Sequence, residues 1–207
     1  MQQIGEVLAV HRGLRGAPAR ARARELLEAV GIPDAARRLD EYPFQFSGGM
    51  KQRVMIAMAL AGEPKLLIAD EPTTALDVTV QRQVLLLLRE KARQKGTAIL
   101  LITHDMALVS QFCDRVYVMY TGAVVEQGST AEVMGNPQHP YTRGLLSGLP
   151  EMVEPGQALM TIPGQVPNLA SLPAGCTFAE RCAQRMPMCA TRPTLNPVNG
   201  NAQRKSA

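Results

Sequence analysis

The alternation of apolar and polar positions divides the first half of the chain into helices followed by a strand. Apolar residues recur at helical spacing over residues 19–30, and Gly31 and Pro33 then end that helix. Residues 54–60 are almost uniformly apolar, so we expect a largely buried helix there. The short continuous apolar run at 66–69 is typical of an inner strand of a parallel sheet.

The same periodicities continue beyond residue 77. Helical spacing alternates with strand patterns, and a hairpin is expected around Thr121 and Gly122. The expected helices are 78–94, 106–112, 130–134 and 141–149, and the expected strands are 97–103, 115–119 and 123–127. From residue 150 onward the chain is rich in proline and glycine and lacks a periodic pattern. This order of elements predicts an α/β fold with an irregular tail.

Composition narrows the class of protein. A chain of 207 residues with 46% hydrophobic residues can bury one core and carry an appendage. The 22 Lys and Arg residues barely exceed the 18 Asp and Glu residues, which is too small a surplus to argue for nucleic acid. An arginine cluster over residues 12–24 fits a solvated helix face. No run approaches the roughly 18–20 apolar residues needed to span a bilayer, so we expect a cytoplasmic protein.

Two stretches carry candidate chemistry. Ser47, Gly48 and Gly49 can cap a helix and leave its first N–H groups open to an anion. Asp70 and Glu71 follow the apolar run at the strand end, where open α/β sheets bind ligands. One carboxylate can then reach Mg²⁺ or its water shell while the other takes a proton from a water. A pair of solvated acids is the alternative interpretation.

His104 follows the second strand pattern, and a lone histidine there can be purely structural. Taken together, however, four segments resemble the motifs of ABC-type ATPases, in the order of that family. FSGGMKQR resembles the signature motif, LLIADEP the Walker B motif, TALD the D-loop and LLITHD the switch-histidine loop. The segments SGGMKQRVMIAMAL and HPYTRGLL and the cysteine-bearing tail are most similar to the ATP-binding subunits of oligopeptide and dipeptide importers.

The resemblance implies a partial P-loop NTPase core with a helical signature subdomain, and it implies a role for each site residue. Two ATPase domains would sandwich ATP, and the signature of one would contact the nucleotide on the other. Asp70 would position Mg²⁺ through water, Glu71 would polarise the attacking water, and His104 would hold the γ-phosphate. The nucleotide-binding residues would be Ser47, Gly48, Gly49, Gln52, Asp70 and Asp77.

The phosphate loop of the family, G-x-x-x-x-G-K-[ST], has no counterpart here, because the sequence contains no Gly-Lys dipeptide. We therefore expect the chain to be the C-terminal portion of such a subunit and to bind and hydrolyse ATP poorly unaided. The expected parts are a helical subdomain with the signature (1–62), a catalytic core portion (63–149) and a transporter-type C-terminal extension (150–207).

Cys176, Cys182 and Cys189 lie close together in the tail, which in a cytoplasmic protein argues for metal rather than a disulfide. The resemblance implies an iron–sulfur cluster with a fourth cysteine further on, and the sequence has none there. Three unligated thiols are the alternative. Cys113 is remote in sequence and is expected to be a buried, inert thiol.

The expected function is that of an ATP-hydrolysing subunit of a peptide importer, bound to the inner face of the plasma membrane through a permease. Its expected partners are a second ATPase subunit, the permease subunits and, indirectly, a solute-binding protein, with no nucleic acid. The alternative is a non-catalytic fragment that donates its signature motif or permease-docking surface to a full-length partner.

Overall fold

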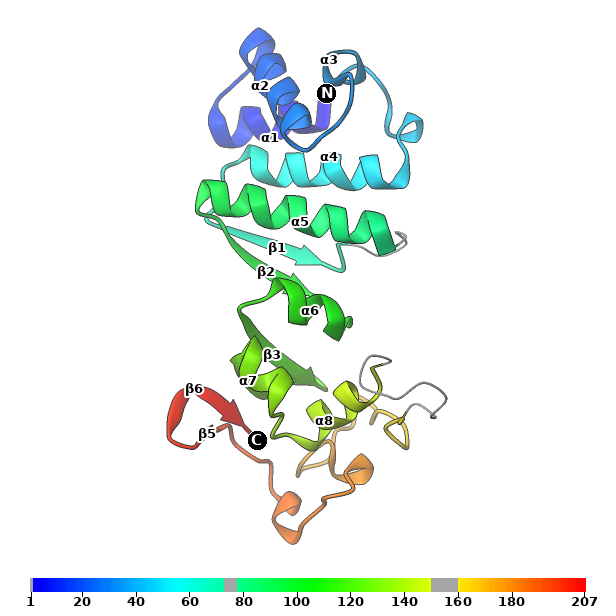
Figure 1. Ribbon diagram of the computed structural model, residues 1–207, viewed down its shortest axis with the longest axis vertical. Helices are drawn as coiled ribbons and strands as arrows, with labels where there is room; N and C mark the ends of the chain where they lie inside the picture. The colour runs from blue at the N-terminus through cyan, green and yellow to red at the C-terminus, as the bar shows by residue number, and fades with distance from the viewer. Residues whose placement is uncertain (1, 73–77, 150–159) are drawn as a thin grey trace. The chain divides into compact units, whose positions relative to one another are not determined.

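The computed structural model describes residues 2–72, 78–149 and 160–207. It forms two compact units, residues 1–104 and 105–207, which are described separately (Figure 1). The expected three-part division at residues 62 and 149 stays a prediction. None of the helices in the described ranges has the length and apolarity that crossing a membrane requires.

The first unit packs helices against a two-stranded parallel sheet (Figure 1). Its elements are α1 (Gln2–Arg12), α2 (Gly16–Ala29), α3 (Ala35–Arg38), η1 (Pro43–Gln45), α4 (Gly48–Ala61), β1 (Leu66–Asp70), α5 (Val78–Lys95) and β2 (Ala98–Ile102). Leu66 pairs with Ala98 and Asp70 with Ile102, so both strands end at the same edge of the sheet. The predicted helices at 19–30, 54–60 and 78–94 and the predicted strands at 66–69 and 97–103 are confirmed.

Among the described residues of the first unit, helices cover one face of this sheet and leave the other exposed. Leu67 and Ala69 are buried in the core that α4 and α5 also form. Leu66 and Ile68 point to the opposite face and are 53% and 61% exposed. The sequence predicts an inner strand of a parallel sheet at residues 66–69; among the described residues the strand is parallel but pairs with β2 alone, and helices cover only one of its faces.

The second unit is built on a four-stranded antiparallel sheet with strand order β3-β4-β6-β5. Its elements are α6 (Met106–Phe112), β3 (Arg115–Tyr120), β4 (Ala123–Ser129), α7 (Thr130–Gly135), α8 (Pro140–Ser147), η3 (Ala179–Arg181), η4 (Pro187–Ala190), β5 (Asn196–Val198) and β6 (Asn201–Ser206). The predicted hairpin is confirmed, since Thr121 and Gly122 turn it with φ values of 47° and 80°.

The tail of the second unit is more regular than expected. Its β5–β6 hairpin turns at Asn199 and Gly200, both with positive φ, and β6 joins the sheet beside β4. Phe178, at the N-terminus of η3, is buried against the rings of Tyr120 and Tyr141. The prediction of a tail without strands is therefore wrong, and aromatic packing holds part of the tail to the sheet.

Candidate functional site

Three predicted site residues come together at the edge where β1 and β2 end. Asp70 is the last residue of β1, Glu71 follows it, and His104 lies two residues beyond Ile102, the end of β2. Nδ1 of His104 lies 2.7 Å from Oε1 of Glu71. The side chain of His104 is 86% exposed and that of Glu71 is 38% exposed. A carboxylate and an imidazole therefore meet at an open strand end, where each can exchange a proton with solvent or ligand.

The backbone at Glu71 is unusual. Its φ of 45° lies in the left-handed region, which few residues other than glycine adopt. Its N–H donates to the carbonyl of Ile102 at 2.9 Å, so β2 holds this turn of the chain. Left-handed residues are frequent at functional sites, where the surroundings fix a conformation that the residue alone would avoid.

The helix α4 begins as the sequence predicted. Ser47 is its N-cap, and its Oγ accepts a hydrogen bond from the N–H of Met50 at 3.4 Å. Ser47 and Gly48 are exposed, while a Cβ on Gly49 would lie 2.8 Å from the side chain of Val80. Glycine thus allows α4 to approach α5 closely, and the open helix N-terminus can receive an anion.

Gln52 has a protein partner. Its side-chain amide donates to the carbonyl of Pro72, the residue after Glu71. The contact places the beginning of α4 beside the loop that follows β1. The predicted contact of Gln52 with nucleotide stays a prediction, and so do the nucleotide contacts of Ser47, Gly48 and Gly49. Asp77 lies outside the described residues.

The residues at this edge fit Mg²⁺ and ATP in part. Asp70 is exposed, and within the described part of the chain its carboxylate has no hydrogen bond or ion pair. It can therefore accept from metal-bound water, since Mg²⁺ prefers oxygen ligands and keeps several waters. The capped start of α4 suits a phosphate oxygen.

Sequence reasoning missed a buried carboxylate in the second unit. Glu126 of β4 is fully buried, and its two oxygens accept the N–H groups of Gln138 and His139 at 2.8 and 2.9 Å. His139 in turn caps α8, because its Nδ1 accepts the N–H of Tyr141 at 3.1 Å. The sequence does contain a signal for this site. Glu126 is a charged residue inside an apolar strand pattern, and the His139-Pro140 turn follows later in the chain.

Burial lowers the pKa of His139 below its usual value near 6.5, although the nearby Glu126 acts in the opposite direction. The unfolded chain therefore binds a proton more readily, so the stability from neutral His139 is present above pH 6.5 and lost below it. We therefore expect the urea concentration at which half of the second unit is unfolded to decrease as the pH is lowered from 7.5 to 5.5. His139→Asn keeps a capping oxygen and should flatten this dependence. An equally steep dependence in that variant would contradict the assignment.

The cysteines do not form the predicted cluster. Among the described residues, no three His, Cys, Asp or Glu side chains lie close enough together to hold a metal ion. Sγ of Cys182 accepts the N–H of Gln184, and Sγ of Cys189 accepts that of Met186. The structure therefore does not support an iron–sulfur cluster on Cys176, Cys182 and Cys189.

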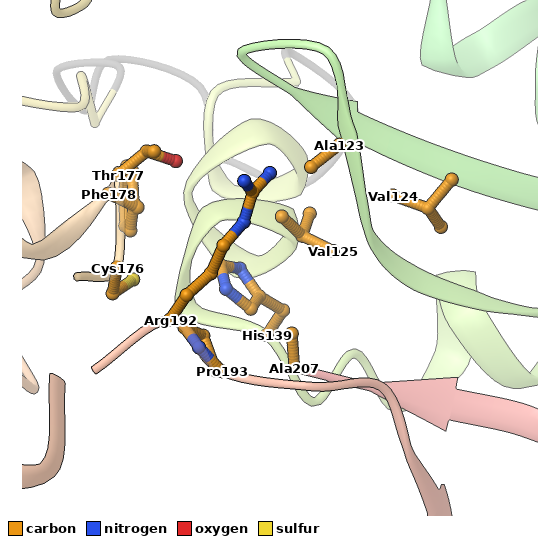
Figure 2. Close-up of a pocket in the computed structure, with 10 residues that line it drawn as sticks. All are labelled: Ala123, Val124, Val125, His139, Cys176, Thr177, Phe178, Arg192, Pro193 and Ala207. Carbon is orange, nitrogen blue, oxygen red and sulfur yellow. The ribbon is translucent and has the colours of Figure 1, made fainter. Parts of the chain in front are cut away.

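A small cavity of about 30 Å³ in the second unit is lined by Cys176, His139 and Arg192 (Figure 2). This volume holds a few water molecules and is far too small for a nucleotide. Cys113 is half-buried, and burial, followed by the charge of Asp114, raises the pKa of its thiol. Its thiolate is therefore disfavoured, as expected of an inert cysteine.

Two family models match the chain. Residues 2–74 match the ABC transporter model, and residues 125–189 match the model of the oligopeptide/dipeptide transporter C-terminal region. The first match contains Ser47, Asp70 and Glu71, and the second contains His139 and the three tail cysteines.

Similar proteins carry related names. The chain is 55% identical over 202 residues to the probable D,D-dipeptide transport ATP-binding protein DdpD of Escherichia coli (strain K12), covering 98% of this chain and 62% of that protein. It is 50% identical over 194 residues to the oligopeptide transport ATP-binding protein OppD of Salmonella typhimurium (strain LT2), covering 94% of this chain and 58% of that protein. The chain thus spans about 60% of the length of these relatives.

A solved structure shares the fold. It is cbiO1 from Clostridium perfringens, part of the ABC transporter complex cbiONQ, with a TM-score of 0.56 and 36% identity. The match covers 64% of this chain and 51% of that one. The chain thus matches the ABC transporter model and the model of the oligopeptide/dipeptide transporter C-terminal region, and the proteins similar to it are dipeptide and oligopeptide transport ATP-binding proteins.

Proposed function

We propose that the chain acts in ATP binding and hydrolysis for an ABC importer of peptides. The observation that carries the proposal is the Glu71–His104 pair at the joint end of two parallel strands, beside Asp70. The names of the similar proteins support peptides as the solute class. The expected division into a signature subdomain, a catalytic core portion and a C-terminal extension is part of this proposal.

In this proposal each group acts on a nucleotide shared between two subunits. Bound Mg²⁺–ATP would supply the phosphoanhydride bond whose cleavage drives the transport cycle. Asp70 would hold the water shell of the metal, Glu71 would accept the proton of the attacking water, and His104 would orient Glu71 and the terminal phosphate. Ser47 and the N–H groups that follow it meet the phosphate on the partner subunit.

The partners follow from this arrangement. A second ATPase subunit completes the nucleotide site, and permease subunits hold the pair at the inner face of the plasma membrane. A solute-binding protein would deliver the peptide to the permease. The excess of Lys and Arg over Asp and Glu is small, and the proposed activity needs no nucleic acid.

A second candidate is an interaction fragment without catalysis of its own. The exposed apolar face of the β1–β2 sheet favours it, since Leu66, Ile68, Leu100 and Ile102 are between 44% and 61% exposed. Monomeric soluble proteins rarely leave large apolar patches uncovered, so this face favours association with another polypeptide.

One experiment separates a chain that donates its signature motif from a chain that acts only through a docking surface. The chain is mixed with a full-length family member that has a phosphate loop but whose own signature serine is replaced by arginine. If the chain donates its signature, ATP hydrolysis by the mixture should rise in proportion to the added chain. A fragment that acts only through a docking surface should instead associate with the full-length protein on a sizing column independently of ATP, with no change in the hydrolysis rate.

A further inference from the structure

Glu71 is the residue on which the proposed chemistry depends most, and its conformation is held from several sides. Its N–H donates to Ile102 of β2, and its carboxylate contacts His104. Beyond it, the carbonyl of Pro72 receives the side-chain amide of Gln52 from α4. Hydrogen bonds to β2 and to α4 therefore hold the chain at and just after the left-handed backbone of Glu71.

These two hydrogen bonds differ in the groups that form them. The bond to Ile102 joins two backbone groups and continues the strand pairing, so no side chain is needed to form it. The bond from Gln52 depends on a single side chain that reaches from a helix. Because the peptide after Glu71 includes the nitrogen of Pro72, the position of this proline limits how the chain leaves Glu71.

Contacts with neighbouring segments hold the beginning of α4 in place, so that Gln52 has a defined position relative to Pro72. Nη1 of Arg53 donates to the carbonyl of Val30 at 2.9 Å, and Nη2 lies 3.4 Å from Oε1 of Gln83 on α5. Gly49 packs against Val80 at a distance that leaves no room for a Cβ. Gln52 thus lies on a helix turn between Gly49 and Arg53, and each of these two residues contacts another segment of the first unit.

We propose that Gln52 is a positioning residue for Glu71: its amide holds the Pro72 carbonyl and so keeps the Glu71 carboxylate directed at His104. This role deepens the proposed function and rests on it. It also connects the helix that starts at Ser47 with the catalytic carboxylate of the same chain. A phosphate at the start of α4 and the base at the end of β1 would then be coupled through one side chain.

The test uses side-chain ¹⁵N–¹H NMR spectra of the whole chain without nucleotide. The chain has three histidines, His11, His104 and His139, all within the described ranges, and of these three His104 is the one that contacts Glu71 there. Glu71→Gln provides the spectrum of His104 without its carboxylate partner. Gln52→Leu, which removes the donor, and Gln52→Glu, which keeps the shape, should both move the His104 signals toward that spectrum.

Matched variants make the result specific. Gln52→Lys keeps a donor on a long side chain and should leave His104 nearer to its wild-type position. Gln94→Leu removes an amide from the exposed part of α5 that pairs with Glu90 of the same helix, and it should leave His104 unchanged. Unchanged signals of His11 and His139 show that each variant is folded, and should Gln52→Leu not fold, Gln52→Glu carries the test.

The proposal is overturned if His104 in both Gln52→Leu and Gln52→Glu keeps its wild-type signals. The measurement needs no ATP, so it remains informative even if the mixing experiment shows no ATP hydrolysis. In that case the NMR result would still support the positioning role of Gln52, while the mixing experiment would contradict the proposed function.

Discussion

Replacing Glu126 by glutamine is expected to lower the free energy of unfolding of the second unit by about 2–3 kcal/mol. The glutamate is fully buried, and each of its oxygens accepts one backbone N–H, from Gln138 and from His139. Glutamine has the same size, but only one of its two terminal atoms is an acceptor. One buried N–H would then face an NH₂ group, and an unsatisfied buried donor is costly.

Tyrosine fluorescence during urea unfolding measures this effect. Three of the four tyrosines, Tyr117, Tyr120 and Tyr141, lie in the second unit, and the chain has no tryptophan. The expected loss corresponds to a fall in melting temperature on the order of 10 °C. Glu180→Gln is the matched control, because Glu180 is exposed and should change stability by less than about 0.5 kcal/mol. Equal midpoints for the two variants would show that the carboxylate is not needed.

The elements that sequence analysis placed correctly are those with strong local signals. The α5 helix follows from apolar positions such as Val84 and Leu88, which face the core at helical spacing. The β3–β4 hairpin follows from strand patterns on either side of Thr121 and Gly122, which both adopt positive φ. The capped start of α4 follows from Ser47 and two glycines. In each case neighbours in sequence decide the structure.

The β5–β6 hairpin shows how a local signal can be overlooked. Asn199-Gly200 is among the strongest hairpin turns known, because both residues tolerate positive φ. The flanking residues are mostly polar, however, so no apolar alternation marked them as strands. Pairing of Gln127 with Lys205 places β6 beside β4, which no local pattern predicts.

The site itself could be predicted only in part. The motifs place Asp70, Glu71 and His104 at strand ends, and the parallel pairing of β1 with β2 brings them to one edge. The left-handed backbone of Glu71 and its contact with His104 depend on packing between distant segments, so no local pattern reveals them. The same holds for the bond from Gln52 to Pro72.

Ser47→Arg is expected to reduce the chain's stimulation of ATP hydrolysis in the mixing experiment by about tenfold or more. A hydrogen bond to a charged group contributes roughly 1.5–3 kcal/mol, and each 1.4 kcal/mol corresponds to a factor of ten. Arginine removes the hydroxyl from the exposed start of α4 and fills the space that a phosphate would need. Its positive charge also opposes the helix dipole at this end.

Two further variants separate this effect from a simple loss of helix stability. Ser47→Thr keeps the capping oxygen that Met50 N–H contacts, so it should retain most of the stimulation. Ser47→Ala loses the cap, at a cost of about 1 kcal/mol in helix stability, but leaves the helix N-terminus open. Stimulation should therefore fall in the order Thr, Ala, Arg. If arginine and alanine reduced it equally, capping of α4 rather than access of a phosphate would explain the role of Ser47, and the shared nucleotide site would lose its support.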